Sequence, residues 1–141
     1  FERKKKIISA ALNFHKPDKD DVLEILSCVG GLDIAAMMGV FLGGALYRVP
    51  VVVDGVISIA AALLAAKFNP FCRDFMIASH KSLEPAYSAA AEELKLKPFL
   101  NLNMRLGEGS GCPLAMQIIE NSLAIMNGMK TFEELGVRSE G

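Results

Sequence analysis

Cysteine, histidine and excess basic charge are all scarce in this sequence, and each shortage argues against a class of protein. The three cysteines are odd in number and form no CxxC pair, which argues against a disulfide framework or a structural zinc site and favours a reducing compartment. The two histidines, His15 and His80, are far apart, so no local metal motif exists. The formal net charge is −1, which lacks the clustered basic charge of a nucleic-acid-binding protein.

A signal peptide and a convincing membrane span are also missing. The stretch 49–66 is apolar, but Asp54 lies inside it, and Pro50 and Gly55 interrupt it. A buried strand, a turn and a buried helix explain this stretch better than a membrane span does. We therefore expect a soluble, cytoplasmic protein with no membrane partner.

Hydrophobic residues make up 52% of the 141 residues, enough for one domain with a sizeable core. Three short apolar runs predict strands over 49–53, 75–78 and 99–104. Periodic apolar residues predict helices over 2–14, from about 20 to just before 30, over 33–46 and 57–67, from 82 onward, and over 113–127. Strands that alternate with helices predict an α/β fold over 1–141, with a mostly parallel sheet flanked by helices in a Rossmann-like three-layer arrangement.

Individual side chains within these helices are assigned as well. Asp20 or Asp21 is expected to cap the second helix, and Ser82 is expected to cap the helix that follows it. Met37 and Met38 are expected in the core. The last helix is expected to turn four apolar side chains inward: Leu114, Ile118, Leu123 and Met126.

Polar loops follow the three predicted strands, at 54–55, 79–82 and 105–111. Ligands of parallel sheets bind at the carboxyl ends of the strands, so we expect these loops to meet in one cleft. Asp54 closes a buried strand before a glycine. That position suits a ligand-binding carboxylate and equally an aspartate that forms a turn.

The loop 105–111, Arg-Leu-Gly-Glu-Gly-Ser-Gly, is the most informative of the three. Its glycines let the backbone approach a ligand and offer amide donors near a helix start. The spacing is neither a dinucleotide fingerprint nor a P-loop. Glu108 stands between two glycines, which suits a general base held in a cleft and equally a solvated loop glutamate.

The segment Ser79-His80-Lys81-Ser82 is open to three interpretations. In the simplest one, Ser82 only caps a helix and His80 is a satisfied polar residue. In the second, the serine and the free amides of a helix start bind phosphate. In the third, Ser79 or Ser82 forms a hydrolase triad with His80 and Asp54, although the sequence has no G-x-S-x-G elbow.

Taken together, these segments resemble the nicotinate-nucleotide:dimethylbenzimidazole phosphoribosyltransferase family, which makes the lower ligand of cobalamin-type cofactors. The resemblance is nearly end to end, and Arg-Leu-Gly-Glu-Gly-x-Gly is its most specific part. It covers the carboxy-terminal two-fifths or so of a full-length member, so we expect a carboxy-terminal portion. The matching segments are Gly30-Gly31 with Ile34-Ala35, 51–58 with 60–65, 79–82 with Glu84, 105–111, and Thr131-Phe132 with Gly136-Val137.

The resemblance implies a reaction as well as a fold. The phosphoribosyl group of nicotinate mononucleotide would pass to dimethylbenzimidazole or a related base, giving α-ribazole phosphate and nicotinate. Nicotinate leaves as a neutral ring, so no metal and no cofactor are expected. The resemblance further implies a homodimer. The alternative is a non-catalytic nucleotide- or base-binding module with the same fold.

Residue roles follow from the same resemblance. Glu108 falls on the family's general base, which removes the benzimidazole proton. Lys4 and Ser82 fall on positions that contact the nucleotide phosphate. The backbone of Leu106 and Gly107 is expected to line the cleft. Asp54, Ser79 and His80 are expected to bind substrate nearby.

Overall fold

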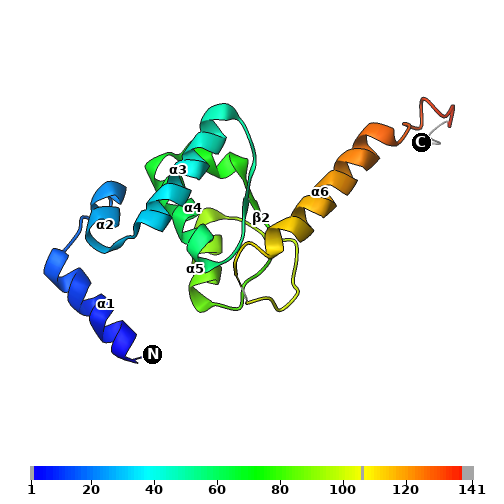
Figure 1. Ribbon diagram of the computed structural model, residues 1–141. Helices are drawn as coiled ribbons and strands as arrows, with labels where there is room; N and C mark the ends of the chain where they lie inside the picture. The colour runs from blue at the N-terminus through cyan, green and yellow to red at the C-terminus, as the bar shows by residue number, and fades with distance from the viewer. Residues whose placement is uncertain (1, 106, 138–141) are drawn as a thin grey trace.

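The computed structural model describes residues 2–105 and 107–137, which form an α/β structure with helices around a small parallel sheet (Figure 1). This confirms the predicted fold class. The elements in chain order are α1 (Glu2–His15), α2 (Val22–Val29), α3 (Leu32–Tyr47), β1 (Val51–Val53), α4 (Val56–Phe68), the 3-10 helix η1 (Pro70–Phe75), β2 (Met76–Ala78), α5 (Pro85–Leu94) and α6 (Gly111–Gly128).

The sheet within the described residues has two strands, β1 and β2, which pair in parallel with Val52 opposite Ile77. The predicted third strand over 99–104 is wrong as a strand. Leu100 alone forms a parallel bridge to His80, and its backbone bonds Ser79 and Lys81 just beyond β2. Asn103 then adopts a φ of 53°, which ends the extended conformation before a ladder can form.

The core lies between the sheet and the helices α3, α4 and α5. On α4, Ile59 and Ala62 have no exposed surface, and Leu94 of α5 is 1% exposed. Small residues allow the close approach of these elements. A Cβ on Gly44 of α3 would lie 2.5 Å from Cγ2 of Val51, so only glycine lets α3 lie this near to β1.

Two predicted helix caps have different outcomes. Asp21 caps α2, because its carboxylate accepts hydrogen bonds from the amides of Leu23 and Glu24. Ser82 does not cap α5, which begins three residues later at Pro85. Proline favours the first helical position and fixes the helix start there. The Ser82 hydroxyl accepts a 3.3 Å hydrogen bond from the amide of Glu84 instead.

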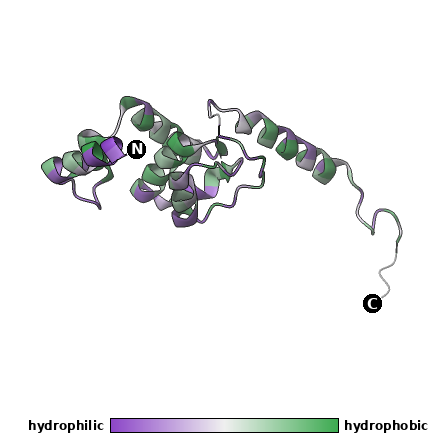
Figure 2. Cartoon of the chain, turned by 90° about the horizontal axis from the view of Figure 1, so that it is seen from below, coloured by the Kyte–Doolittle hydropathy of each residue, from purple (hydrophilic) through white to green (hydrophobic). Residues whose placement is uncertain are grey.

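Helices α1 and α6 stand away from the core, as both views show (Figure 2). The expectation that the last helix buries its apolar side chains is therefore wrong for this chain. Within the described residues, only Gly111 and Ala115 of α6 are buried. Periodicity identifies an apolar face but does not say what covers it. The four side chains expected inward are all exposed, by 41% to 79%: Leu114, Ile118, Leu123 and Met126.

The apolar stretch over 49–66 forms β1, a turn and most of α4, as predicted. None of the helices in the described part of the chain combines the length and apolarity that crossing a membrane requires.

Candidate active site

The polar loops after β1 and β2 meet the loop 105–111 around one pocket of about 560 Å3. This is the convergence that the sequence predicts for the carboxyl ends of parallel strands. Asp54, His80, Ser82 and Glu108 therefore share a single pocket, although as many as 54 positions separate them in the chain. The other lining residues are Asp33, Met37, Gly55, Val56, Ile57, Ser58, Glu84, Arg105, Gly107 and Gly109.

The loop that carries Glu108 has a left-handed backbone at three consecutive residues. The φ angles are 78° at Gly107, 60° at Glu108 and 76° at Gly109. Glycine adopts this region freely, but a glutamate pays about 1 kcal/mol or more for it. Within the loop, the amide and hydroxyl of Ser110 both donate to the Gly107 carbonyl. Glu108 itself lines the pocket and is exposed to solvent in this chain.

Asp54 connects that loop to the sheet. Its Oδ2 accepts a hydrogen bond from the Gly109 amide and its Oδ1 accepts one from the Gly111 amide, both at 3.0 Å. The backbone of Asp54 is held in turn, because its amide donates to Oγ of Ser58 at 2.9 Å. The residue is 9% exposed, so both oxygens are committed to the loop in a nearly dry environment.

His80 lies behind the Asp54 carboxylate and is 1% exposed. Its Nδ1 is 3.1 Å from Oγ of Ser79 and 3.7 Å from Oδ1 of Asp54. The single proton of the Ser79 hydroxyl goes to the carbonyl of Val53 at 2.7 Å. A hydroxyl has only one donor, so we assign the proton between Ser79 and His80 to Nδ1 of the imidazole.

This geometry does not fit a hydrolase triad built on Ser79. In a triad the imidazole uses one nitrogen for the carboxylate and the other for the serine, whereas here Nδ1 faces both. Ser79 also has no exposed surface and donates its proton to the backbone. The Ser82 hydroxyl accepts from the Glu84 amide and belongs to the pocket wall.

The remaining predicted site residues are placed differently. Ser82 is buried, 4% exposed, and lines the pocket together with Gly107 and Glu108. Lys4 lies on the exposed helix α1, apart from these loops (Figure 1), and does not line the pocket. The prediction for Leu106 falls outside the described residues.

Several pocket residues escaped the sequence analysis. Met37 packs against the core as predicted but also lines the pocket, and its neighbour Met38 is buried as predicted. Asp33 enters the pocket from the first turn of α3, just after Gly30-Gly31, and that paired glycine was the available signal. Glu84 and Arg105 belong to the segments that carry the family resemblance, but neither was assigned a binding role.

Further polar groups lie next to this site. The Tyr87 ring stacks on His80 at 6.5 Å, and its buried hydroxyl has no hydrogen-bond partner among the described residues. Burial, and secondly the negative charge of Asp54, raise the pKa of Tyr87 to about 12. Burial also raises the pKa of the Cys112 thiol, again with a contribution from Asp54. Within 2–105 and 107–137, no three His, Cys, Asp or Glu side chains are grouped so that they could hold a metal.

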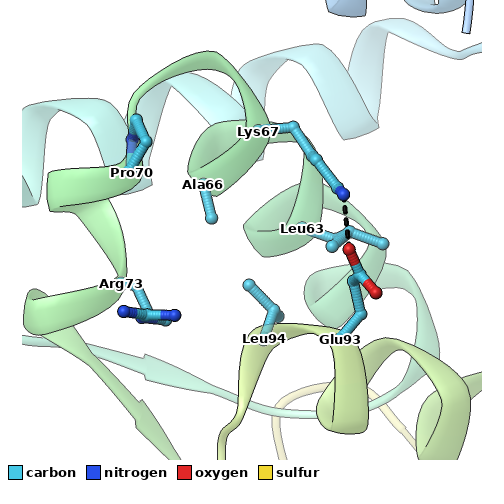
Figure 3. A pocket seen from close by; sticks show the side chains of 7 residues that line it. All are labelled: Leu63, Ala66, Lys67, Pro70, Arg73, Glu93 and Leu94. Carbon is cyan, nitrogen blue, oxygen red and sulfur yellow. Dashed lines mark hydrogen bonds and ion pairs between the residues drawn. The ribbon is translucent and has the colours of Figure 1, made fainter. Parts of the chain in front are cut away.

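A smaller hollow of about 160 Å3 lies between α4, η1 and α5 (Figure 3). It is near the end of α4 and the start of β2, which is the amino edge of the sheet. Lys67 and Glu93 form an ion pair at its rim, and both side chains are more than half exposed. An exposed pair of this kind contributes little stability.

Comparison with known proteins points to the same family as the motifs in this pocket. The sequence profile of a family described as phosphoribosyltransferase matches residues 1–137. The chain is 55% identical over 134 residues to a nicotinate-nucleotide–dimethylbenzimidazole phosphoribosyltransferase of Clostridium perfringens strain ATCC 13124, covering 95% of this chain and 37% of that protein. It is 46% identical over 139 residues to the protein of that name from Geobacter sp. strain M21, covering 99% and 40%.

A solved structure shows the same likeness. CobT from Thermus thermophilus superposes with a TM-score of 0.89 at 38% identity, over 99% of this chain and 41% of that one. The chain thus spans about two fifths of the length of these relatives. The family profile nevertheless extends across nearly the whole chain, and the matched range includes every residue that lines the pocket described above. The chain therefore belongs to the nicotinate-nucleotide–dimethylbenzimidazole phosphoribosyltransferase family.

Proposed function

We propose that this chain supplies the general base and part of the nucleotide pocket of an enzyme of cobalamin lower-ligand assembly. The enzyme transfers the phosphoribosyl group of nicotinate mononucleotide to dimethylbenzimidazole or a related base, giving α-ribazole phosphate and nicotinate. The observation that carries the proposal is the meeting of Glu108 and Ser82 in one pocket, on the two motifs through which the sequence resembles the family.

The proposed reaction needs a base to deprotonate the attacking ring and needs little catalysis of the departure of nicotinate. A benzimidazole ring nitrogen attacks the anomeric carbon, and the Glu108 carboxylate takes the proton from the second ring nitrogen. The bond to nicotinate breaks with its electron pair returning to the pyridinium nitrogen, so the leaving ring departs neutral. That departure needs neither a metal nor a cofactor, and a positioned carboxylate matches the remaining task.

The phosphate end of the nucleotide is proposed to lie near Ser82. Its hydroxyl is on the pocket wall just before α5, and the left-handed loop at Gly107 brings backbone close to the same space. Lys4 and the backbone of Leu106 belong to the proposal through the family motif alone. Asp54 and His80 line the pocket and Ser79 is buried next to His80, and hydrogen bonds to the backbone, to one another and to loop 107–111 hold these three residues.

We also propose that the full-length enzyme, meaning a polypeptide of the length of the curated relatives that contains these residues, is a cytoplasmic homodimer. The cysteines Cys28, Cys72 and Cys112 are all free, which suits a reducing compartment. The exposed apolar side chains of α6 supply surface that an interface would cover.

A chromatographic assay with the full-length enzyme tests the function. Incubation with nicotinate mononucleotide and dimethylbenzimidazole should release nicotinate and form α-ribazole phosphate in equal amounts. The control omits dimethylbenzimidazole and should release no nicotinate. Nicotinate released without the base would indicate a hydrolase, and binding without release would indicate a non-catalytic nucleotide-binding module.

A further inference from the structure

The loop 107–111 cannot hold its conformation through its own contacts alone. Gly107, Glu108 and Gly109 are consecutive left-handed residues, and glutamate at φ 60° is strained by about 1 kcal/mol or more. The internal bonds of the loop join Ser110 to Gly107 and the Cys112 amide to the Gly109 carbonyl. Strained backbone of this kind persists where surrounding structure determines it.

Asp54 supplies that external support from more than 50 positions earlier in the chain. Its two oxygens accept from the Gly109 and Gly111 amides, one residue and three residues after Glu108. Hydrogen bonds to a carboxylate are roughly twice as strong as neutral ones. Asp54 directly follows Val53, which has no exposed surface and is paired in the sheet. Asp54 therefore ties the loop to the buried end of β1.

His80 lies close to both the carboxylate and the loop. The imidazole Nδ1 points to Oδ1 of Asp54 at 3.7 Å while it bonds Ser79. It also packs directly against Gly111, where an added Cβ would lie 2.7 Å from Cε1 of the ring and closer still to Nδ1. Because His80 is 1% exposed, neither the ring nor the glycine can move independently.

We propose that Asp54, braced by His80, is a positioning residue for Glu108: it holds loop 107–111 in the conformation that presents the Glu108 carboxylate to the pocket. The inference deepens the proposed function and rests on it, since it assumes that Glu108 is the base. It differs from the substrate-binding role expected from the sequence, because both Asp54 oxygens are already used by loop amides.

A double-mutant cycle in the full-length enzyme tests the proposal. Asp54→Asn keeps the shape but leaves one acceptor oxygen, and its NH2 group would face a backbone N–H. A shift of the base by about 1 Å costs on the order of a hundredfold, so kcat should fall about ten- to a hundredfold. The KM for nicotinate mononucleotide should stay within about threefold, because loop displacement disturbs the base more than the phosphate subsite.

The decisive arm is the same substitution in a Glu108→Gln background. If Asp54 acts through Glu108, Asp54→Asn should change the residual rate by no more than about threefold there, because the base is already absent. An equal loss in both backgrounds would overturn the proposal in favour of direct substrate contact or a general structural role. Asp74→Asn, which removes an exposed carboxylate on η1, is the charge-matched control and should leave kcat unchanged.

Two further measurements test the positioning role of Asp54. One uses a conservative variant, and the other does not depend on turnover. Asp54→Glu keeps both oxygens and the charge but adds one methylene. It should lower kcat by a smaller factor that also disappears with Glu108→Gln, and a loss that persists there would contradict the proposal. Amide hydrogen exchange of 107–112 should be at least about tenfold faster in Asp54→Asn than in the wild type, because one of the two loop amides loses its acceptor and faces an NH2 group instead. This readout needs no turnover, so unchanged exchange refutes the positioning role even if the proposed reaction is not observed.

Discussion

Substitution of Gly111 by alanine should destabilise the protein far more than its small size suggests. An alanine Cβ would lie 2.7 Å from Cε1 of His80 and 3.0 Å from Cγ, and closer still to Nδ1. Real Cβ atoms essentially never come nearer than 3.0 Å to their neighbours, and the ring is 1% exposed. The loop or the ring must therefore move away.

The magnitude follows from two terms. Overpacking a buried contact costs about 1–3 kcal/mol. Movement of Gly111 also weakens the hydrogen bond from its amide to Asp54, and a charged hydrogen bond contributes about 1.5–3 kcal/mol. Because the two terms overlap, we expect a loss of about 2–4 kcal/mol in the free energy of unfolding.

Urea unfolding of the 141-residue chain, followed by circular dichroism, measures this loss. Gly39→Ala on α3 is the matched control, because it is also a helical glycine but has no heavy atom within 4 Å of the added Cβ. Alanine is the better helix former, so Gly39→Ala should stabilise by about 0.5–1 kcal/mol. If both variants had the same midpoint, the contact between His80 and Gly111 would not constrain the loop.

Three further predictions concern neighbouring groups. Burial favours the neutral Tyr87 phenol, so the free energy of unfolding should decline as pH rises from 10, where the unfolded phenol ionises, towards the folded pKa of about 12. Tyr87→Phe should lack this part of the decline, as measured by urea midpoints. Burial raises the pKa of the Cys72 thiol, so iodoacetamide should label Cys72 only after unfolding. Rapid labelling of the folded chain, measured by mass spectrometry, would contradict its buried position. Glu108→Gly should leave the free energy of unfolding unchanged or raise it by up to about 1 kcal/mol, because glycine removes the strain of a left-handed backbone. A loss of stability in urea would show that the glutamate side chain stabilises the loop.

Most of the fold could be predicted from local sequence patterns. The Val run before Asp54 and the Ala/Leu run after it set the strand, the turn and the start of α4, and each boundary has a local cause. The error at 99–104 arose because strand propensity does not reveal backbone reversal. Asn103 adopts a left-handed conformation that its sequence neighbours did not indicate. Likewise, the apolar stripe on α6 predicted burial, but a stripe contains no information about its partner.

The site was predictable as a set of loops but not as a set of contacts. Strand ends placed Asp54, Ser82 and Glu108 at one edge of the sheet, which the pocket confirms. The bonds from Asp54 to the loop amides depend on positions more than 50 residues apart, and no local pattern encodes them. The same holds for Asp33, which reaches the pocket from α3 through tertiary packing.

The central claim is that Glu108 accepts the benzimidazole proton, and the turnover of Glu108→Gln in the full-length enzyme tests it most directly. Glutamine keeps the shape and can donate and accept hydrogen bonds, but it cannot take up that proton. General-base removal costs roughly a hundred- to ten-thousandfold, so base-dependent nicotinate release should slow by that factor while the affinity for nicotinate mononucleotide stays within about threefold. If Glu108→Gln released nicotinate at a rate within a few-fold of the wild type, the proton would go elsewhere and the proposed role of Glu108 would be wrong.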